Sequence, residues 1–207
     1  MLLDALESSY SKVGIQDTIV ITRSNKMANR YNEGIRRTIL WKDSTISKGD
    51  YIMIVKNNYF WTAENKDVSF IANGDIAEII DIDNYETLYG FDFANVTVRF
   101  SDYNNFEITL KVLLNTLSSE SPSLSYEENN KLYTEVSHDY AEIKNKRKLY
   151  EEIKKNPYFN ALQIKFAYAI TCHKAQGGQW KHVYIDHGFF NKDNVDQEFI
   201  RWLYTAC

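Results

Sequence analysis

A series of short apolar segments between Gly49 and about Leu114 limits most strongly what this chain can fold into. Five segments rich in β-branched and aromatic residues follow at close spacing, and the turn signals between them include Asn73–Asp75 and Asp83–Glu86. They read YIMIV, VSFIA, IAEIIDI, ANVTVRF and FEITLKV. Strands this close together leave no room for helical crossovers, so they cannot join a parallel sheet. We therefore predict a small antiparallel β-barrel over residues 46–115.

The two ends of the chain show strands alternating with helices instead. Near the amino end, the apolar strand Ile19–Thr22 precedes a helix for which Ser24 or Asn25 is a natural N-cap. The apolar face of this helix consists of Met27, Tyr31, Ile35 and Ile39. Apolar strands resume at Leu162, and the chain closes on the amphipathic helical segment NVDQEFIRWLYTAC.

These patterns predict an α/β fold into which a barrel and a helical segment are inserted. We expect residues 1–45 and 161–207 to form the two parts of the α/β core, and residues 116–160 to form a helical insert or linker. Within that insert, the basic run from Lys144 to Lys155 could follow a phosphate backbone. A solvated helix face is the favoured interpretation, because Glu151 and Glu152 interrupt the run.

Composition excludes several classes of protein. A formal net charge of −4 and a pI of about 5.6 argue against a broad basic surface that coats duplex DNA, but not against a narrow groove that grips a few phosphates. No apolar run is long enough for a membrane span, and the opening lacks the features of a secretion signal. Cys172 and Cys207 are far apart and no histidine has metal-ligand spacing, so we expect a reduced, cytoplasmic protein without a metal site or a catalytic nucleophile.

The stretch AYAITCHKAQGGQWKHVYID, residues 167–186, carries more polar chemistry than packing requires. An apolar strand ends at Thr171, and the turn that follows holds His173, Lys174 and two glycines. Hydroxyl, imidazole and ammonium groups are ligands for phosphate or sugar, and glycine allows close approach of the backbone. From the local pattern alone, an ordinary strand-to-helix turn with polar capping remains an equal alternative.

This stretch closely resembles motif V of superfamily 1 helicases, whose RecD-like members carry Thr-x-His-Lys-Ser/Ala-Gln-Gly. Further along, RWLYTAC resembles the start of motif VI, although the chain ends at Cys207, short of the arginine finger of the family, and Arg201 is not that finger. The segment IVITRSNKMANRYN resembles the opening of the second motor domain. The segments KGDYIMIVKNNY and ANGDIAEII resemble the SH3-like barrel inserted there.

The resemblance implies a RecA-like second motor domain of an ATP-dependent DNA helicase, moving 5′ to 3′ in repair or recombination. Thr171, His173, Lys174, Ser24 and Asn25 would then contact single-stranded DNA. The residues that would face the nucleotide are Gly177, Gly178 and Gln179, where Gln179 replaces the glutamate that usually bonds the ribose. No residue of the chain is assigned a catalytic role.

The chain has no P-loop sequence among its eight glycines. ATP and Mg²⁺ would therefore be bound mainly by the missing first motor domain, and this chain should be inactive alone. Asp186, at the end of HVYID, is interpreted as the end of a buried strand and not as a magnesium ligand. The partners implied are single-stranded DNA, the first motor domain and possible subunits of a nuclease–helicase complex, with no membrane.

A second class of function remains open. The chain could be a non-catalytic module that binds single-stranded nucleic acid or docks a partner, with the barrel as its working part. The consecutive aromatic residues Tyr59–Trp61 lie at a turn between barrel strands, where they could stack on unpaired bases or pack in the core.

Overall fold

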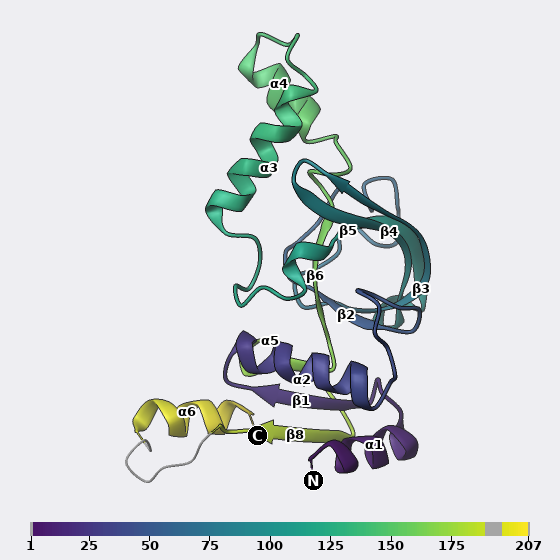
Figure 1. Ribbon diagram of the computed structural model, residues 1–207, viewed down its shortest axis with the longest axis vertical. Helices are drawn as coiled ribbons and strands as arrows, with labels where there is room; N and C mark the ends of the chain where they lie inside the picture. Colours follow the sequence, from purple (N-terminus) through teal and green to yellow (C-terminus); the bar gives the residue numbers. More distant parts are fainter. Residues whose placement is uncertain (1, 189–195, 207) are drawn as a thin grey trace. The chain divides into compact units, whose positions relative to one another are not determined.

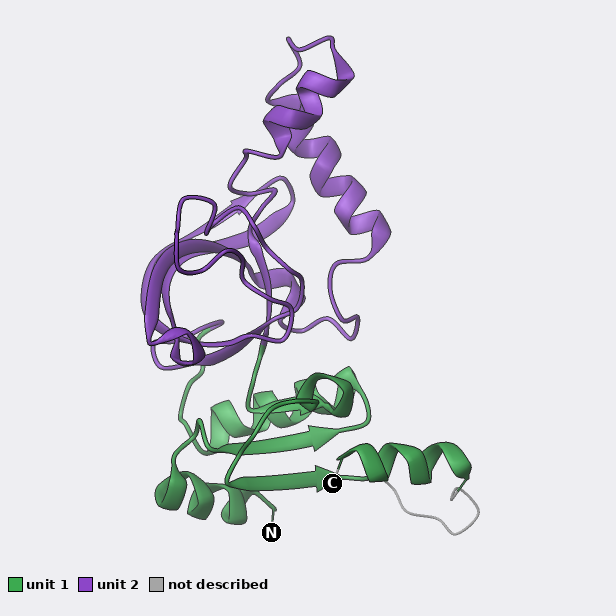
Figure 2. Cartoon of the chain, turned by 180° about the vertical axis from the view of Figure 1, so that it is seen from behind, with its two compact units in different colours: residues 1–44, 166–207 green, residues 45–165 purple. Residues whose placement is uncertain are grey.

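The computed structural model describes residues 2–188 and 196–206, and the chain divides into two compact units (Figure 2). Unit 1 comprises residues 1–44 and 166–207, and unit 2 comprises residues 45–165. The chain therefore leaves unit 1, forms unit 2 as one continuous insertion, and returns.

Unit 1 is built on a parallel three-stranded sheet in the order β7-β1-β8. Figure 1 labels two of these strands, β1 and β8, which lie side by side. The strands are β1 (Thr18–Thr22), β7 (Ala169–Thr171) and β8 (His182–Asp186). The helices of this unit are α1 (Leu2–Val13), α2 (Asn25–Thr38), α5 (Cys172–Ala175) and α6 (Gln197–Ala206). Every residue of β1 is buried, as a central strand covered on both faces requires. The predicted amphipathic helix at the carboxyl end corresponds to α6, while its residues 194, 195 and 207 lie outside the described part.

Helix α2 forms where the sequence predicts it, but its buried face is displaced from the predicted one. The buried residues are Ala28, Asn32, Ile35 and Arg36, so only Ile35 of the predicted apolar face is fully covered. Asn32 is buried because its amide nitrogen donates to the carbonyl oxygen of Ala169 at 2.9 Å, and its oxygen accepts from the N–H of Ala169 at 2.7 Å. A polar side chain thus fastens α2 to strand β7.

Unit 2 contains a closed five-stranded barrel in the order β2-β3-β4-β5-β6. Its strands are β2 (Tyr51–Ile54), β3 (Ile76–Leu88), β4 (Phe91–Phe100), β5 (Phe106–Leu113) and β6 (Leu162–Phe166), with 3₁₀ turns η1 (Ser101–Tyr103) and η2 (Leu114–Thr116). The first four pair antiparallel in sequence, and β6 pairs parallel to β5. As predicted, the β-rich segments form a barrel and do not enter the parallel sheet.

Two details of the predicted barrel are wrong. The segment VSFIA is not a strand: its one pairing is an isolated bridge between Ile71 and Asn58, while the side chain of Asn65 accepts the N–H of Val68 and holds a turn. Nor is Asp83–Glu86 a turn. Strand β3 continues through it with two irregularities in register, and the hairpin turns at Tyr89 and Gly90, both at positive φ.

The fifth strand of the barrel comes from a segment expected in the α/β core. The second part of that core was predicted to begin at residue 161, but β6 pairs with β5, and the N–H of Val55 donates to the carbonyl oxygen of Gln163 at 3.0 Å. Unit 1 accordingly resumes at Phe166. The shift arises because a parallel partner far along the chain takes the open barrel edge, and local periodicity does not reveal such pairing.

The helical insert consists of two helices, α3 (Tyr126–His138) and α4 (Lys146–Ile153), where the sequence indicated one polar helical stretch. Ser125 and Glu128 form a capping box at the start of α3. One hydrophobic cluster joins these helices to barrel strands β4 and β5. Its buried members are Phe91, Phe93, Leu113, Leu124, Leu132, Val136, Ile153 and Ala161. The basic run forms part of α4 and pairs locally, Arg147 with Glu151 and Lys155 with Glu152, as a solvated face does.

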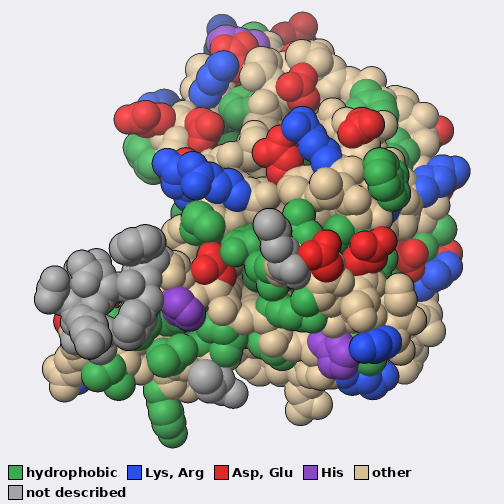
Figure 3. Space-filling model, turned by 60° about the horizontal axis from the view of Figure 1, so that its bottom comes forward, with side chains coloured by type: hydrophobic (Ala, Val, Ile, Leu, Met, Phe, Trp, Pro, Cys, Tyr) green, Lys and Arg blue, Asp and Glu red, His purple; other side chains and the backbone are tan. Residues whose placement is uncertain are grey.

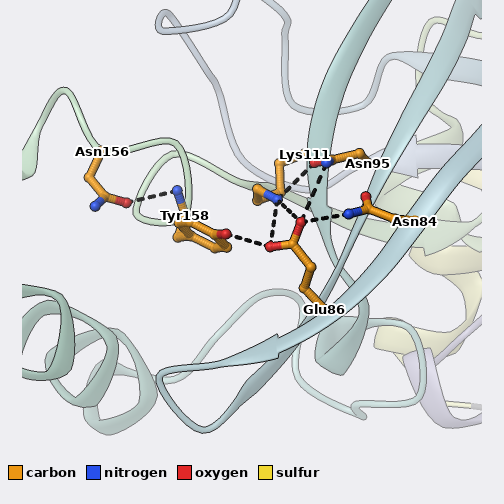
Figure 4. A network of polar contacts seen from close by, with 6 residues as sticks. All are labelled: Asn84, Glu86, Asn95, Lys111, Asn156 and Tyr158. Carbon is orange, nitrogen blue, oxygen red and sulfur yellow. Dashed lines mark hydrogen bonds and ion pairs between the residues drawn. The ribbon is translucent and has the colours of Figure 1, made fainter.

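A polar network adjoins this cluster (Figure 4). Lys111 of β5 is 5% exposed, and its ammonium donates to Glu86 at 3.2 Å and to the side-chain oxygen of Asn95 at 2.8 Å. The same ammonium lies 4.3 Å from the centre of the Tyr158 ring, and the Tyr158 hydroxyl donates to Glu86. That hydrogen bond, more than any other cause, lowers the pKa of Glu86 and raises the pKa of Tyr158 to about 12. The buried ammonium is therefore fully satisfied, and the segment after α4 is tied to strand β3.

Replacing Glu86 with glutamine should destabilise unit 2 by about 1–3 kcal/mol, because it leaves the buried ammonium of Lys111 without a counter-charge. The double variant Glu86→Gln/Lys111→Met should lose less than the sum of the two single variants, since it removes both charges together. Chemical denaturation of the four proteins measures this coupling. Strict additivity would contradict a shared network.

Candidate functional site

Three polar residues end the three strands of unit 1 and lie side by side at the carboxyl edge of the sheet. In the parallel register, Thr22 of β1 pairs with Thr171 of β7 on one side and with Asp186 of β8 on the other. The segments that follow these strands therefore leave the sheet at one edge. In open α/β sheets, ligands bind at this edge, where backbone N–H groups and helix N-termini face outward.

Two hydroxyl groups organise the loop after β1. The buried hydroxyl of Thr22 donates to the carbonyl oxygen of Ser24 at 3.0 Å. The carbonyl oxygen of Ile170 lies 3.4 Å from the same hydroxyl, so the loop is tied to β7. Ser24 is the N-cap of α2, and its Oγ accepts the N–H of Met27 at 3.2 Å. Of the two predicted caps the structure has Ser24, and Asn25 begins the helix. No acidic residue occupies the first turn, so the positive helix end is not neutralised there.

The turn after β7 presents its polar side chains differently. Thr171 ends the strand as predicted and occupies the N-cap position of the four-residue helix α5, but its side chain makes no capping hydrogen bond. His173 is exposed, and Lys174 is half-buried with its pKa lowered by burial. The interpretation of this turn as an ordinary polar cap therefore lacks the hydrogen bond that would define it.

Both glycines of the turn have conformational reasons to be glycine. Gly177 lies at φ +86°, which side chains rarely adopt, and a Cβ atom at Gly178 would overlap the ring of Trp180. The N–H of Gly178 donates to the carbonyl oxygen of Ala175 at 3.0 Å and closes the turn. Gln179 follows with an exposed side chain. Thr171 and His173 thus stand at the start of α5, and the residues assigned to the nucleotide follow its end.

Asp186 is not simply the buried end of a strand. Its side chain is partly exposed, and it accepts the N–H of Gly188 at 2.9 Å. It also accepts a hydrogen bond from Tyr31 of α2, whose pKa is raised by burial first and then by this carboxylate. Asp186 therefore bonds both Gly188, two residues further along the chain, and Tyr31 of α2 at this edge. Within residues 2–188 and 196–206, no cluster of potential metal ligands exists.

Arg23 is a residue at this edge that sequence reasoning missed. Its guanidinium lies 5.4 Å from the ring centre of Phe199 and 5.5 Å from that of Trp202, so the loop after β1 contacts α6. The thiol of buried Cys172 approaches the carbonyl oxygen of Trp202 at 4.0 Å. The sequence does show an arginine after one strand and aromatic residues on a distant helix. It does not show that they contact each other, because that contact depends on the fold.

Figure 3 shows hydrophobic side chains exposed among polar ones on the side of the molecule that carries α1, β8 and α6. The large exposed hydrophobic residues of these elements are Leu3, Val183, Ile200 and Tyr204.

In the part of the chain that the structure describes, no helix is both long and apolar enough to cross a bilayer.

Replacing Gly178 with alanine should destabilise unit 1 by about 1–3 kcal/mol, since the new methyl group displaces the Trp180 ring. Gly34 offers a matched control: it lies within α2 with no atom near its Cβ position, so Gly34→Ala should stabilise the helix by about 0.5–1 kcal/mol. Denaturation curves report both effects, and a change in tryptophan fluorescence in Gly178→Ala alone reports the displacement of the Trp180 ring. A Gly178→Ala protein as stable as the wild type would contradict the described packing.

Comparison with known families gives one match, at this end of the chain. Residues 166–207 match the family model described as the UvrD-like helicase C-terminal domain. The match begins at the residue where unit 1 resumes, and it contains β7, α5, β8 and α6. A search of curated proteins finds no match. The family match supports a helicase C-terminal domain of the UvrD type for this segment.

Proposed function

We propose that this chain is the greater part of the second, RecA-like motor domain of an ATP-dependent DNA helicase, with the barrel of unit 2 as its SH3-like insert. The observation that carries the proposal is the row formed by Thr171, Thr22 and Asp186, at the edge from which the family-matched turn departs. The RecD-like branch, 5′ to 3′ movement and a role in DNA repair or recombination belong to the proposal on the resemblance of residues 167–180. A cytoplasmic location belongs to it on the cysteine usage of the sequence.

In this proposal, Thr171 and His173 hydrogen-bond to phosphate oxygens of single-stranded DNA. The hydroxyl of Thr171 is not used for capping, and the imidazole of His173 is exposed. Backbone N–H groups at the start of α2, next to Ser24 and Asn25, add donors with a positive helix end behind them. Contacts to phosphate and sugar carry no sequence information directly, which suits a motor that moves along any sequence. Lys174 contributes positive charge to the same turn.

The nucleotide lies on the other side of α5 in this proposal. The positive φ of Gly177 and the missing side chain at Gly178 let the backbone approach a ligand closely. The carboxamide of Gln179 can accept a hydrogen bond from a ribose hydroxyl, more weakly than a carboxylate would. ATP bound with Mg²⁺ supplies the free energy for movement. Because these 207 residues contain no P-loop sequence, hydrolysis requires a P-loop from another domain.

The test is to change Thr171 and His173 to alanine together and measure binding of a fluorescein-labelled oligothymidine by anisotropy. We expect binding to weaken by at least about tenfold, since two hydrogen bonds to charged phosphates are lost. Thr134→Ala/His138→Ala is the matched control, because it removes the same two side-chain types, both exposed, from α3.

Unchanged affinity in a folded Thr171→Ala/His173→Ala protein would reject the proposed DNA track. The alternative function is a non-catalytic module whose barrel binds the nucleic acid. It predicts that the Thr171→Ala/His173→Ala variant keeps the wild-type affinity. Circular dichroism of each variant establishes that the protein tested is folded.

A further inference from the structure

We infer that unit 2 carries a second binding site for single-stranded nucleic acid, in a groove between the loop after β2 and the segment that follows α4. The inference rests on the proposed function for its ligand class and on unit 2 alone for its geometry. The groove has a cavity volume of about 380 Å³, within the usual ~300–1,000 Å³ of ligand sites. Its walls include Lys56, Tyr59 and Phe60 on one side and Lys154 and Phe159 on the other.

The charge of the groove favours an anionic ligand. Two lysines line it and no aspartate or glutamate does, although the chain as a whole carries a net charge of −4. Among the described residues, neither Lys56 nor Lys154 takes part in an ion pair. Lys154 lies with its ammonium 4.5 Å from the centre of the Tyr150 ring, which leaves its hydrogen-bond donors available to a phosphate.

The aromatic residues at the groove favour unpaired bases. Tyr59 lies in the loop after β2 and is 62% exposed, and one face of its ring stacks on Phe70 with the ring centres 5.1 Å apart. Phe70 thus holds the Tyr59 ring in place and leaves its other face for a ligand. A base that stacks on such a ring gains roughly tenfold in affinity regardless of its identity. Trp61, in contrast, donates its indole N–H to the carbonyl oxygen of Asn160, so its role is structural.

Hydrogen bonds hold the two walls together before any ligand binds. The side-chain oxygen of Asn58 accepts the N–H groups of Phe60 and Trp61, and its amide nitrogen donates to the carbonyl oxygen of Asn160 at 2.8 Å. The side chain of Asn160 donates in turn to the carbonyl oxygens of Lys154 and Asn156, both at 2.8 Å. A groove already ordered loses little conformational entropy on binding.

The experiment measures anisotropy of a labelled twelve-residue oligothymidine with the whole chain and its variants. We expect Tyr59→Ala to weaken binding about five- to tenfold, and Tyr59→Phe to stay within twofold of the wild type, because phenylalanine keeps the stacking face. Lys56→Ala should reduce the slope of log K against log salt concentration by about 0.7, the value for one phosphate contact on a single strand.

Tyr85→Ala and Lys146→Ala are the controls, since each removes an exposed side chain of the same kind from unit 2 outside the groove. Wild-type binding that persists in Tyr59→Ala and Lys56→Ala would overturn this inference and leave the proposed function standing. Wild-type protein that binds no oligothymidine would overturn both. A poly-glutamate peptide and unlabelled DNA are each tested as competitors of the labelled oligothymidine. If the peptide competes as strongly as the DNA, the groove binds acidic peptides and base stacking is refuted.

Discussion

Parallel pairing of β1 with β7 and β8 is the constraint on which the candidate site depends. Only this register brings Thr22 into one row with Thr171 and Asp186, which both lie far along the chain from it. Asn32 supports the register, because its side chain bonds both backbone groups of Ala169 and holds β7 against α2. If that pairing slipped by one residue, Thr171 would point to the opposite face of the sheet. In the sequence, unit 2 is inserted between β1 and β7 as one continuous segment, and the two strands pair despite this insertion.

Polar side chains form different kinds of hydrogen bond in the two units. In unit 1, polar side chains at the carboxyl edge bond mostly to backbone, as Thr22 and Ser24 do, and this orders the loops that would meet a ligand. In unit 2, the buried ammonium of Lys111 is satisfied by Glu86 and Asn95, and that of Lys165 by the carbonyl oxygens of Thr116 and Ser119. Burial lowers the pKa of Lys165 to about 8. These lysines fix strands and connections, so the charge available to a ligand lies elsewhere, on residues such as Lys56.

Local patterns in the sequence predicted the elements better than their partners. The strand before Thr22, helix α2, the turn at Asn73–Asp75 and the end of a strand at Thr171 all follow from periodicity and turn chemistry within a few residues. The role of Leu162–Phe166 in the barrel could not be predicted this way, because its partner β5 lies some fifty residues earlier and pairs in parallel. The Glu86–Tyr158 contact and the packing of Arg23 on α6 join segments that lie still farther apart in the chain. In the candidate site, the motif supplied the residue types, and the register supplied Thr22 and Asp186 as the neighbours of Thr171.

The central claim is that single-stranded DNA binds at the carboxyl edge of the unit 1 sheet. Backbone amide chemical shifts of the ¹⁵N-labelled chain, recorded during titration with oligothymidine, test it most directly. The account predicts that the largest shifts fall on residues 22–25 and 171–174, where the loops after β1 and β7 leave the sheet. Shifts confined to unit 2, with those two loops unchanged at saturation, would contradict it.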